Sequence, residues 1–490
     1  AVVDARRRNP GTSRLVFSFL RDTLLLRGLE NFAPGMRPRL QSFVMSWQQF
    51  TGPVMAKSVE DTAFYVYNRL VSLNEVGGHP DQFGTPVDAF HEQNRARAER
   101  WPHAMLATST HDTKRSEDVR ARISVLSELP EVWEAAVERW AELNAGKKQT
   151  VEDLPAPDRN DEYLFYQTLV GVWPDGAEAA DEALVERLQG YALKAANEAK
   201  VHTSWINPDE AYSEALHSFV AQALGDPAFI ADFLPLQRQV AHFGRLNSLA
   251  QTLLKLSAPG VPDLYQGTEL WDLSLVDPDN RRPVDYGQRR AHLSALLEHR
   301  GDRVALAREL VETCADGRIK LAVIGWTLAY RRDNAGLFDA GSYGPLEATG
   351  ERAQHVVAYA RRAGQQEVLV VVPRLVAALT GREECQPLGP HGAPPAAARR
   401  QASVSQRVHR GDAARGRSAA GGRAEGLPRG AAGAGVAPAA ATPTRRSGRT
   451  TWGARASRRR RRLPGWSEPR QTYPRRRAPA APRAPSATGR

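Results

Sequence analysis

The sequence is poor in cysteine and has no long apolar run. Cys314 and Cys385 are its only cysteines in 490 residues, which excludes a disulfide framework and favours a reducing, cytoplasmic setting. No uninterrupted apolar stretch reaches the length of a membrane span, and the basic residues near the N-terminus are not followed by the apolar segment of a signal peptide. We therefore expect no membrane partner, while the oligomeric state stays open.

The C-terminal part lacks several residue types at once. Residues 381–490 contain no Lys, Phe, Ile, Met or Asn, but they hold 24 Arg and five acidic residues, a net charge of +19. Because the whole chain carries +11, residues 1–380 carry −8. This composition indicates either an out-of-frame translation of a GC-rich gene or a disordered arm, since it offers too little apolar surface to fold. Arg458–Arg462 would bind polyanions non-specifically, so we expect no specific nucleic-acid partner.

Apolar residues recur at helical spacing over much of the first 250 residues. The pattern predicts helices within 12–50, interrupted at Pro34-Gly35, and over 59–73. Thr85 is expected to cap a further helix that has Pro86 at its first position. Residues 130–250 are expected to be a long series of helices, too much for one connection between strands and hence an inserted subdomain.

Strands are expected on both sides of that helical region. Residues 103–110, "HAMLATST", predict a buried strand followed by a helix that starts near Ser116, and an apolar segment within 253–270 predicts another strand. After helices to about residue 312, three stretches are expected to be mainly strands, at 319–330, 355–362 and 367–375.

His111 and Asp112 stand where the first of these strands ends, with Lys114 two residues further on. Three interpretations fit the pair. It could bind a metal together with other ligands such as His91 and His103, or Asp112 could cap the next helix. Alternatively, the imidazole and the carboxylate could bind sugar hydroxyls and stabilise an oxocarbenium ion.

Several motifs resemble those of the α-amylase superfamily, glycoside hydrolase family 13, in the branch that forms trehalosyl ends. They are "THDTKRSEDVRAR" (110–122), "QQFTGPVMAKSVEDTAFYVYNRLVSLNEVGG" (48–78), "KVHTSWINPDEAY" (200–212), "PGVPDLYQGTELWDLSLVDPDNRRPVDY" (259–286) and "LFDAGSYGPL" (337–346). The resemblance extends over about 12–375. Ser58, Val66 and His79 depart from the family pattern, which affects local loop contacts.

The resemblance implies roles for individual residues. Asp112 is similar to the aspartate that stabilises the transition state, and His111 to its hydroxyl-binding partner. Substrate-binding positions are implied for a larger group, in which Lys114 would hold the acceptor sugar and Tyr65 could stack on a sugar ring: Lys114, Arg115, Lys57, Glu60, Asp61 and Tyr65. For Tyr65, Phe64, Tyr67 and Trp205, packing in the core is an equally open interpretation. A turn, more than a calcium loop, is favoured for Asp277-Asp279-Asn280, because the Gly and final Glu of an EF-hand are absent.

The implied reaction is intramolecular transglucosylation of a maltooligosaccharide or glycogen-derived α-glucan, which turns the α-1,4 link at the reducing end into an α,α-1,1 link without metal or organic cofactor. Such a reaction needs a carboxylate nucleophile and a carboxyl acid/base. Residues 1–110 contain no motif that resembles either. We therefore expect the C-terminal portion of a longer enzyme, inactive alone; the alternatives are another α-amylase-type hydrolase and a noncatalytic maltooligosaccharide-binding remnant.

The expected fold class is α/β, with the C-terminal part of a (β/α)8 barrel, a large helical insertion, a small all-β domain and a disordered tail. The expected divisions are a partial barrel with acceptor-site segments at 1–125, the helical insertion at 126–250, the end of the barrel at 251–312, the β domain at 313–380 and the tail at 381–490.

Overall fold

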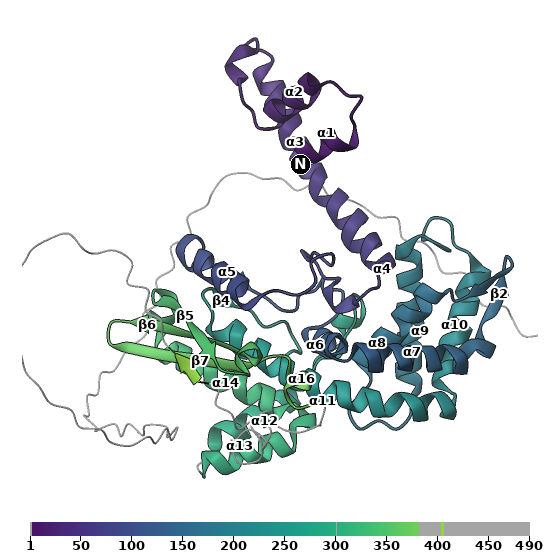
Figure 1. The fold of residues 1–490 in the computed structure, drawn as a ribbon, viewed down its shortest axis with the longest axis vertical. Coiled ribbons are helices and arrows are strands. Elements are labelled where there is room, and N and C mark those ends of the chain that lie inside the picture. Colours follow the sequence, from purple (N-terminus) through teal and green to yellow (C-terminus); the bar gives the residue numbers. More distant parts are fainter. Residues whose placement is uncertain (1, 300, 382–402, 406–490) are drawn as a thin grey trace, which may run out of the picture. The chain divides into compact units, whose positions relative to one another are not determined.

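The computed structural model describes residues 2–299, 301–381 and 403–405 (Figure 1). The chain divides into two units, 1–411 and 412–490, and all described residues belong to the first. The predicted tail therefore lies outside the described residues, apart from Gly381 and the short strand β8 (Ser403–Ser405).

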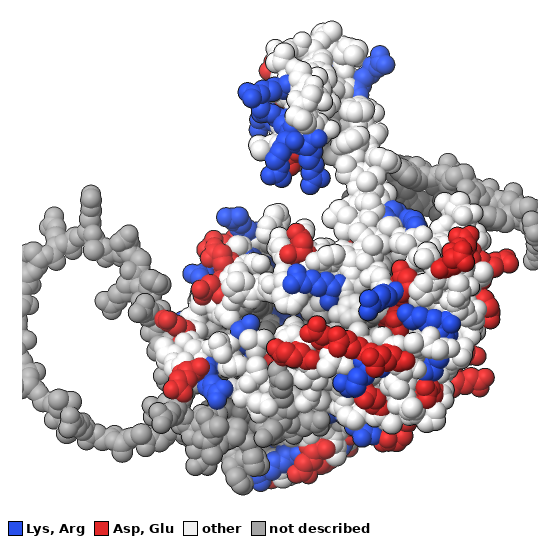
Figure 2. Space-filling view, turned by 45° about the vertical axis from the view of Figure 1, so that its right-hand side comes forward, with Lys and Arg blue, Asp and Glu red and all other residues white. Residues whose placement is uncertain are grey.

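The N-terminal helices bury almost none of their side chains. They are α1 (Val2–Arg8), α2 (Arg14–Leu24) and α3 (Arg37–Met55), and the predicted break at Pro34-Gly35 lies between α2 and α3. In these three helices only Thr23 and Val44 are buried. Exposed apolar side chains include Leu15, Phe19, Leu20, Phe43, Met45, Trp47, Phe50, Val54 and Met55. Basic side chains gather on these N-terminal helices, whereas acidic and basic side chains are mixed over the rest of the face shown in Figure 2.

The predicted helix over 59–73 is only half formed. A π-helical segment, η2 (Ala56–Ala63), continues α3 and passes into α4 (Phe64–Val66), where the helix ends. It ends there because the side-chain amide of Asn74 donates to the carbonyl oxygens of Phe64 (2.9 Å) and Tyr67 (2.8 Å). These bonds take over carbonyl groups that the next helical turn would have used.

Helix α5 (Val87–Arg100) leads to the predicted strand, which proves very short. The expected cap at Thr85 is wrong by one residue, because Pro86 occupies the N-cap position without a side-chain hydrogen bond. Strand β1 (Met105–Leu106) pairs in parallel with β4 (Val261–Pro262), and Met105 is 72% exposed. The strand is therefore not buried, because among the described residues β4 is its only hydrogen-bonded neighbour.

The parallel pair depends on one glycine. Gly260 has φ +127° and leads into β4, and a β-carbon there would lie 2.7 Å from Cγ of Leu106. A side chain at this position would therefore be strained by the backbone and would collide with β1.

The helical region predicted for 130–250 is confirmed. It contains α7 (Pro130–Asn144), α8 (Arg159–Val172), α9 (Glu182–Ala199), α10 (Glu210–Leu224) and α11 (Pro227–Ser257), with a small hairpin of β2 (Gln149–Val151) and β3 (Leu154–Ala156) (Figure 1). The short helix α6 (Glu117–Val125) begins at the Ser116 cap, as expected, and is buried against α8 and α11. Close contact with α11 is possible because residue 244 is Gly: a β-carbon there would lie 2.5 Å from Cγ of Arg122.

The region after β4 contains helices and then a sheet. Helices α12 (Tyr286–Glu298), α13 (Arg303–Glu312), α14 (Arg318–Asp333) and α15 (Ala335–Asp339) precede the antiparallel strands β5 (Ser342–Thr349), β6 (Val356–Ala363) and β7 (Gln366–Pro373), followed by α16 (Val376–Leu379). The sheet order is β7-β6-β5-β8. The strands expected at 355–362 and 367–375 are confirmed.

The strand expected at 319–330 is wrong, because this stretch forms α14. Its apolar run suggested a strand, but the face that contains Lys320, Leu321 and Ile324 is buried, and α14 packs on α11. Tertiary packing has overridden the local β-branched content. The sheet therefore begins at Ser342 and not at residue 313.

No single helix among the described residues is long and apolar enough to cross a membrane. Taken together, α10 and α11 meet that test of length and composition, but they are bent by 75° at their junction.

Candidate active site

The His-Asp pair lies on an exposed turn in the segment that leads from β1 to α6. His111 and Asp112 are exposed, while the next residues, beginning with Thr113, are buried. Thr110 forms the turn: its carbonyl oxygen accepts from the Thr113 hydroxyl at 2.9 Å, and its hydroxyl accepts from the backbone N–H of Asp112 at 3.2 Å. The turn thus presents two polar side chains on a backbone fixed by its own hydrogen bonds.

The segment that contains Asp279 and Asn280 holds this turn in place. The side-chain amide of Asn280 donates to the carbonyl oxygen of His111 at 3.0 Å. The neighbouring Asp279 accepts two hydrogen bonds from Arg187 of α9, at 2.9 and 3.0 Å. The predicted turn at Asp277-Asp279-Asn280 therefore serves as a brace between α9 and the His-Asp turn.

A carboxylate shared by two lysines lies beside the turn. Asp61 of η2 accepts from Nζ of Lys114 (2.6 Å) and from Nζ of Lys57 (2.5 Å). Burial opposes ionisation of Asp61, but the hydrogen bonds from Lys114 and Lys57 outweigh it and lower the pKa of this carboxyl. The side chain of Lys114 is only 2% exposed, so its ammonium contributes to the site through Asp61.

Lys57 connects this group to two further carboxylates. The hydrogen bond and the charge of Asp61 raise the pKa of Lys57, and the charges of Glu198 and Asp112 add smaller effects in the same direction. Lys57 is exposed and lies in the π-helical segment, a type of distortion that often occurs at functional sites. Lys57 and Asp112 are therefore two exposed groups of opposite charge at this place.

Glu75 fixes the backbone that follows the turn. Its carboxylate accepts from the backbone N–H groups of Lys114 (2.8 Å) and Arg115 (3.3 Å), and it pairs with Arg120 at 3.5 Å. The buried guanidinium of Arg115 donates to the Tyr191 hydroxyl at 2.6 Å. Arg115 therefore holds the scaffold together from inside.

The remaining expected residues divide between the surface and the core. Glu60 is half-buried and accepts from the backbone N–H of Gly77 at 3.1 Å. Tyr65 and Phe64 are buried in the core, and burial raises the pKa of the Tyr65 hydroxyl, so core packing is the correct interpretation for both. Tyr67 and Trp205 are exposed, and for them core packing is wrong.

A buried ion network lies behind the turn. Nζ of Lys320, which is fully buried on α14, contacts Glu117 at 2.7 Å and Asp118 at 2.9 Å, both in the first turn of α6. Lys255 of α11 contacts Glu117 at 3.3 Å and donates to the Thr108 hydroxyl at 2.6 Å. The network thus joins the segment after β1 to α6, α11 and α14.

We expect this network to make stability depend on pH. Burial opposes ionisation of Glu117, but the charges of Lys320 and Lys255 outweigh it and lower its pKa to about 2. A depressed carboxyl pKa stabilises the fold above the unfolded-state value of about 4.5, and this contribution, of the order of 3 kcal/mol, is lost as the pH falls toward 2. In urea unfolding, the gap in unfolding free energy between the wild type and Glu117→Gln should narrow between pH 5.5 and pH 3. A difference in unfolding free energy that stays constant over this pH range would contradict the low pKa of Glu117.

Two other interpretations of the His-Asp pair find no support in this geometry. Ser116, and not Asp112, caps α6 by accepting from the backbone N–H of Val119 at 3.4 Å. His91 is buried and bonds to the Tyr343 hydroxyl at 2.7 Å. Over residues 2–299, 301–381 and 403–405, no group of three or more His, Cys, Asp or Glu side chains could hold a metal ion.

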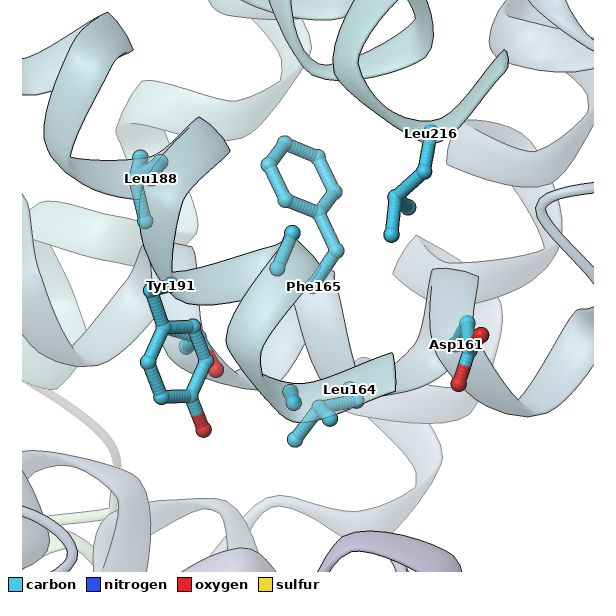
Figure 3. Close-up of a pocket in the computed structure, with 9 residues that line it drawn as sticks. Asp161, Leu164, Phe165, Leu188, Tyr191 and Leu216 are labelled. Atoms are coloured by element: carbon cyan, nitrogen blue, oxygen red, sulfur yellow. The ribbon is translucent and has the colours of Figure 1, made fainter. Parts of the chain in front are cut away.

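A small enclosed space inside the helical region is not a ligand site. Phe165, Leu188 and Leu216 surround it, and Asp161 and Tyr191 lie at its margins (Figure 3). Its volume of about 10 Å³ is no more than one water molecule needs. It is a packing gap between α8, α9 and α10.

The sequence did not indicate the long-range contacts that hold the site together. Asn280 contacts a residue 169 positions away, Glu75 one 39 positions away, and Lys320 one 202 positions away. Asn280 and Glu75 fall within motifs of the resembling family, and a turn was predicted at Asn280. Nothing marked Lys320, which lies in the stretch expected to be a strand.

Comparisons with known proteins confirm the resemblance seen in the motifs. No protein-family profile matches the chain. A curated protein of Mycobacterium tuberculosis, "Putative maltooligosyl trehalose synthase", is 43% identical over 327 residues, which are 67% of this chain and 38% of that protein. The solved maltooligosyltrehalose synthase of Arthrobacter ramosus is 38% identical, with a TM-score of 0.63 over 78% of this chain and 44% of its own.

A solved structure from Sulfolobus tokodaii, a hypothetical maltooligosyl trehalose synthase, gives 34% identity and a TM-score of 0.58 over 69% of this chain and 42% of its own. Over the matched residues the chain therefore has the fold of these synthases, and it spans less than half the length of each of these three relatives. This agrees with the expectation of a portion of a longer enzyme.

Proposed function

We propose that this chain, as a homologue of maltooligosyl trehalose synthases, supplies part of an active site that rearranges maltooligosaccharides. We assign it to glycoside hydrolase family 13, to the cytoplasm, and to the later strands of a (β/α)8 barrel, of which β1 and β4 are members. The observation that carries the proposal is the exposed His111-Asp112 turn, which follows β1 on the side of its carboxyl end, the end at which barrel enzymes carry their catalytic residues.

In the proposed reaction, a carboxylate nucleophile of the complete enzyme forms a glycosyl ester with the chain as the α-1,4 bond at the reducing end breaks. A carboxyl acid protonates the departing glucose oxygen, and as a carboxylate it then takes the proton of the attacking hydroxyl while the glycosyl ester bond breaks. The freed glucose turns and its anomeric hydroxyl attacks, so that an α,α-1,1 bond forms and the product is an isomer of the substrate. Asp112 stabilises the cationic transition state and His111 orients sugar hydroxyls. Lys57 and Glu60 bind the acceptor, and Lys114 acts by fixing Asp61.

The nucleophile and the acid/base carboxyl are not among the motifs of this chain, so we propose that the chain alone binds substrate without converting it. Incubation with maltohexaose should yield no trehalosyl ends, while calorimetry should detect binding. Losing a covalent nucleophile costs many orders of magnitude in rate.

Product analysis distinguishes the alternatives. Released glucose and maltose would indicate a hydrolase, and trehalosyl ends would show that the chain is complete in itself. Binding that requires residues 381–490 and weakens steeply with salt would indicate a polyanion-binding protein.

A further inference from the structure

The loop between α9 and α10 exposes two large apolar side chains side by side. Trp205 is 60% exposed and Ile206 is 96% exposed. Single exposed apolar residues are common on protein surfaces, but an exposed Trp next to an almost fully exposed Ile calls for a physical explanation. The pair lies on the motif "KVHTSWINPDEAY", to which the proposed function gives no role.

An ion pair, a ring stack and hydrogen bonds fix the loop that carries the pair. His202 contacts the Asp158 carboxylate at 2.8 Å and stacks on Tyr212, with ring centroids 4.4 Å apart. The backbone N–H of Ser204 donates to the carbonyl oxygen of Asn207 at 3.2 Å, and the N–H of Asn207 donates to the Ser204 hydroxyl at 3.0 Å. Trp205 and Ile206 therefore form the tip of a closed turn, and a ligand that contacts them has little ordering cost to offset.

The base of the loop touches the candidate active site. Lys200 ends α9 with φ +57°, and its ammonium donates to the Thr62 hydroxyl at 3.1 Å, one residue after Asp61. Glu198, two residues earlier, is close enough to raise the pKa of Lys57. Five residues span at most about 18 Å, so Trp205 lies within that reach of Lys200.

The size and surroundings of the pair favour a sugar ring as its ligand. A stable protein partner would need a buried area above about 1,000 Å², far more than two side chains offer. An indole ring has a flat apolar face with a polar N–H at its edge, which suits the apolar C–H face and hydroxyl rim of a pyranose ring.

We propose that Trp205, supported by Ile206, is a stacking platform for a glucose unit of the α-glucan that lies beyond the reacting units. This proposal rests on the proposed function and adds a determinant of chain length to it. Longer maltooligosaccharides would reach the platform, and short ones would bind only around Asp112 and Lys57.

The test measures binding of maltoheptaose and maltotriose to the full chain by calorimetry. Trp205→Ala should weaken maltoheptaose binding about tenfold and leave maltotriose binding unchanged, while Trp205→Phe should retain most of the affinity. Trp101→Ala, at another exposed Trp that directly follows α5, is the matched control and should bind both sugars as the wild type does.

The outcomes separate the two proposals. Equal maltoheptaose affinity of Trp205→Ala and Trp101→Ala, with unchanged thermal unfolding, overturns the platform and leaves the proposed function intact. An equal loss for both sugars also overturns it, because the effect would then be general. A wild type that binds neither sugar overturns the proposed function and the platform with it.

Discussion

Asp112→Asn should reduce trehalosyl-end formation about a thousandfold when the chain is tested within a complete enzyme. The suitable host is the Arthrobacter ramosus synthase with its homologous region replaced by residues 12–375 of this chain, because these proteins share 38% identity and one fold. Removing an electrostatic group that acts on developing charge costs about 10²–10³ in kcat, and here a full charge is lost next to the proposed cationic centre.

The side chain of Asp112 is exposed, so this substitution should leave the fold intact. The rate loss should appear in kcat with KM little changed, because the group acts on the transition state. Asp153→Asn is the matched control: this residue has φ +64° in the β2–β3 turn, a conformation that Asn adopts readily. An Asp112→Asn chimera that keeps more than a tenth of the activity would contradict the assigned role.

The second large effect is expected on stability. Lys320→Met should lower the free energy of unfolding by about 3–5 kcal/mol, because it leaves Glu117 and Asp118 buried with insufficient positive charge. Urea unfolding of the wild type and the variant at pH 7 measures this loss.

The control for Lys320→Met is an ion pair at the surface. Arg238 and Glu178 are 51% and 74% exposed, and Arg238→Met should cost no more than about 1 kcal/mol. Adding Glu117→Gln and Asp118→Asn to Lys320→Met should restore part of the stability, since the uncompensated charges are then gone. A Lys320→Met loss as small as that of Arg238→Met would show that the network adds nothing to stability.

Local patterns were sufficient where a structure depends on neighbouring residues. The helix start at Ser116 and the helices of 130–250 follow from capping and from apolar spacing, which act over a few residues. The stretch 319–330 shows the limit, because Lys320 lies buried in a helix only through carboxylates about 200 positions away. Its charge would have been expected at the surface.

The sequence identified residues of the candidate site, but not their burial or their contacts with one another. The sequence indicated His111, Asp112 and Lys114 together, but the burial of Lys114 depends on Asp61, 53 positions earlier. Likewise, Trp205 looked equally suited to a core or a surface position, because exposure is decided by how the whole loop folds back between Lys200 and Asp209.

The brace of the His-Asp turn and the Trp205 loop both depend on α9. Arg187 on α9 holds Asp279, and the adjacent Asn280 holds the carbonyl oxygen of His111, while the Trp205 loop begins where α9 ends. A sugar bound to Trp205 and a sugar bound at Asp112 would thus both contact segments that are attached to α9. If a sugar at one of these places shifts α9, linkage requires that each sugar change the affinity for the other by the same factor.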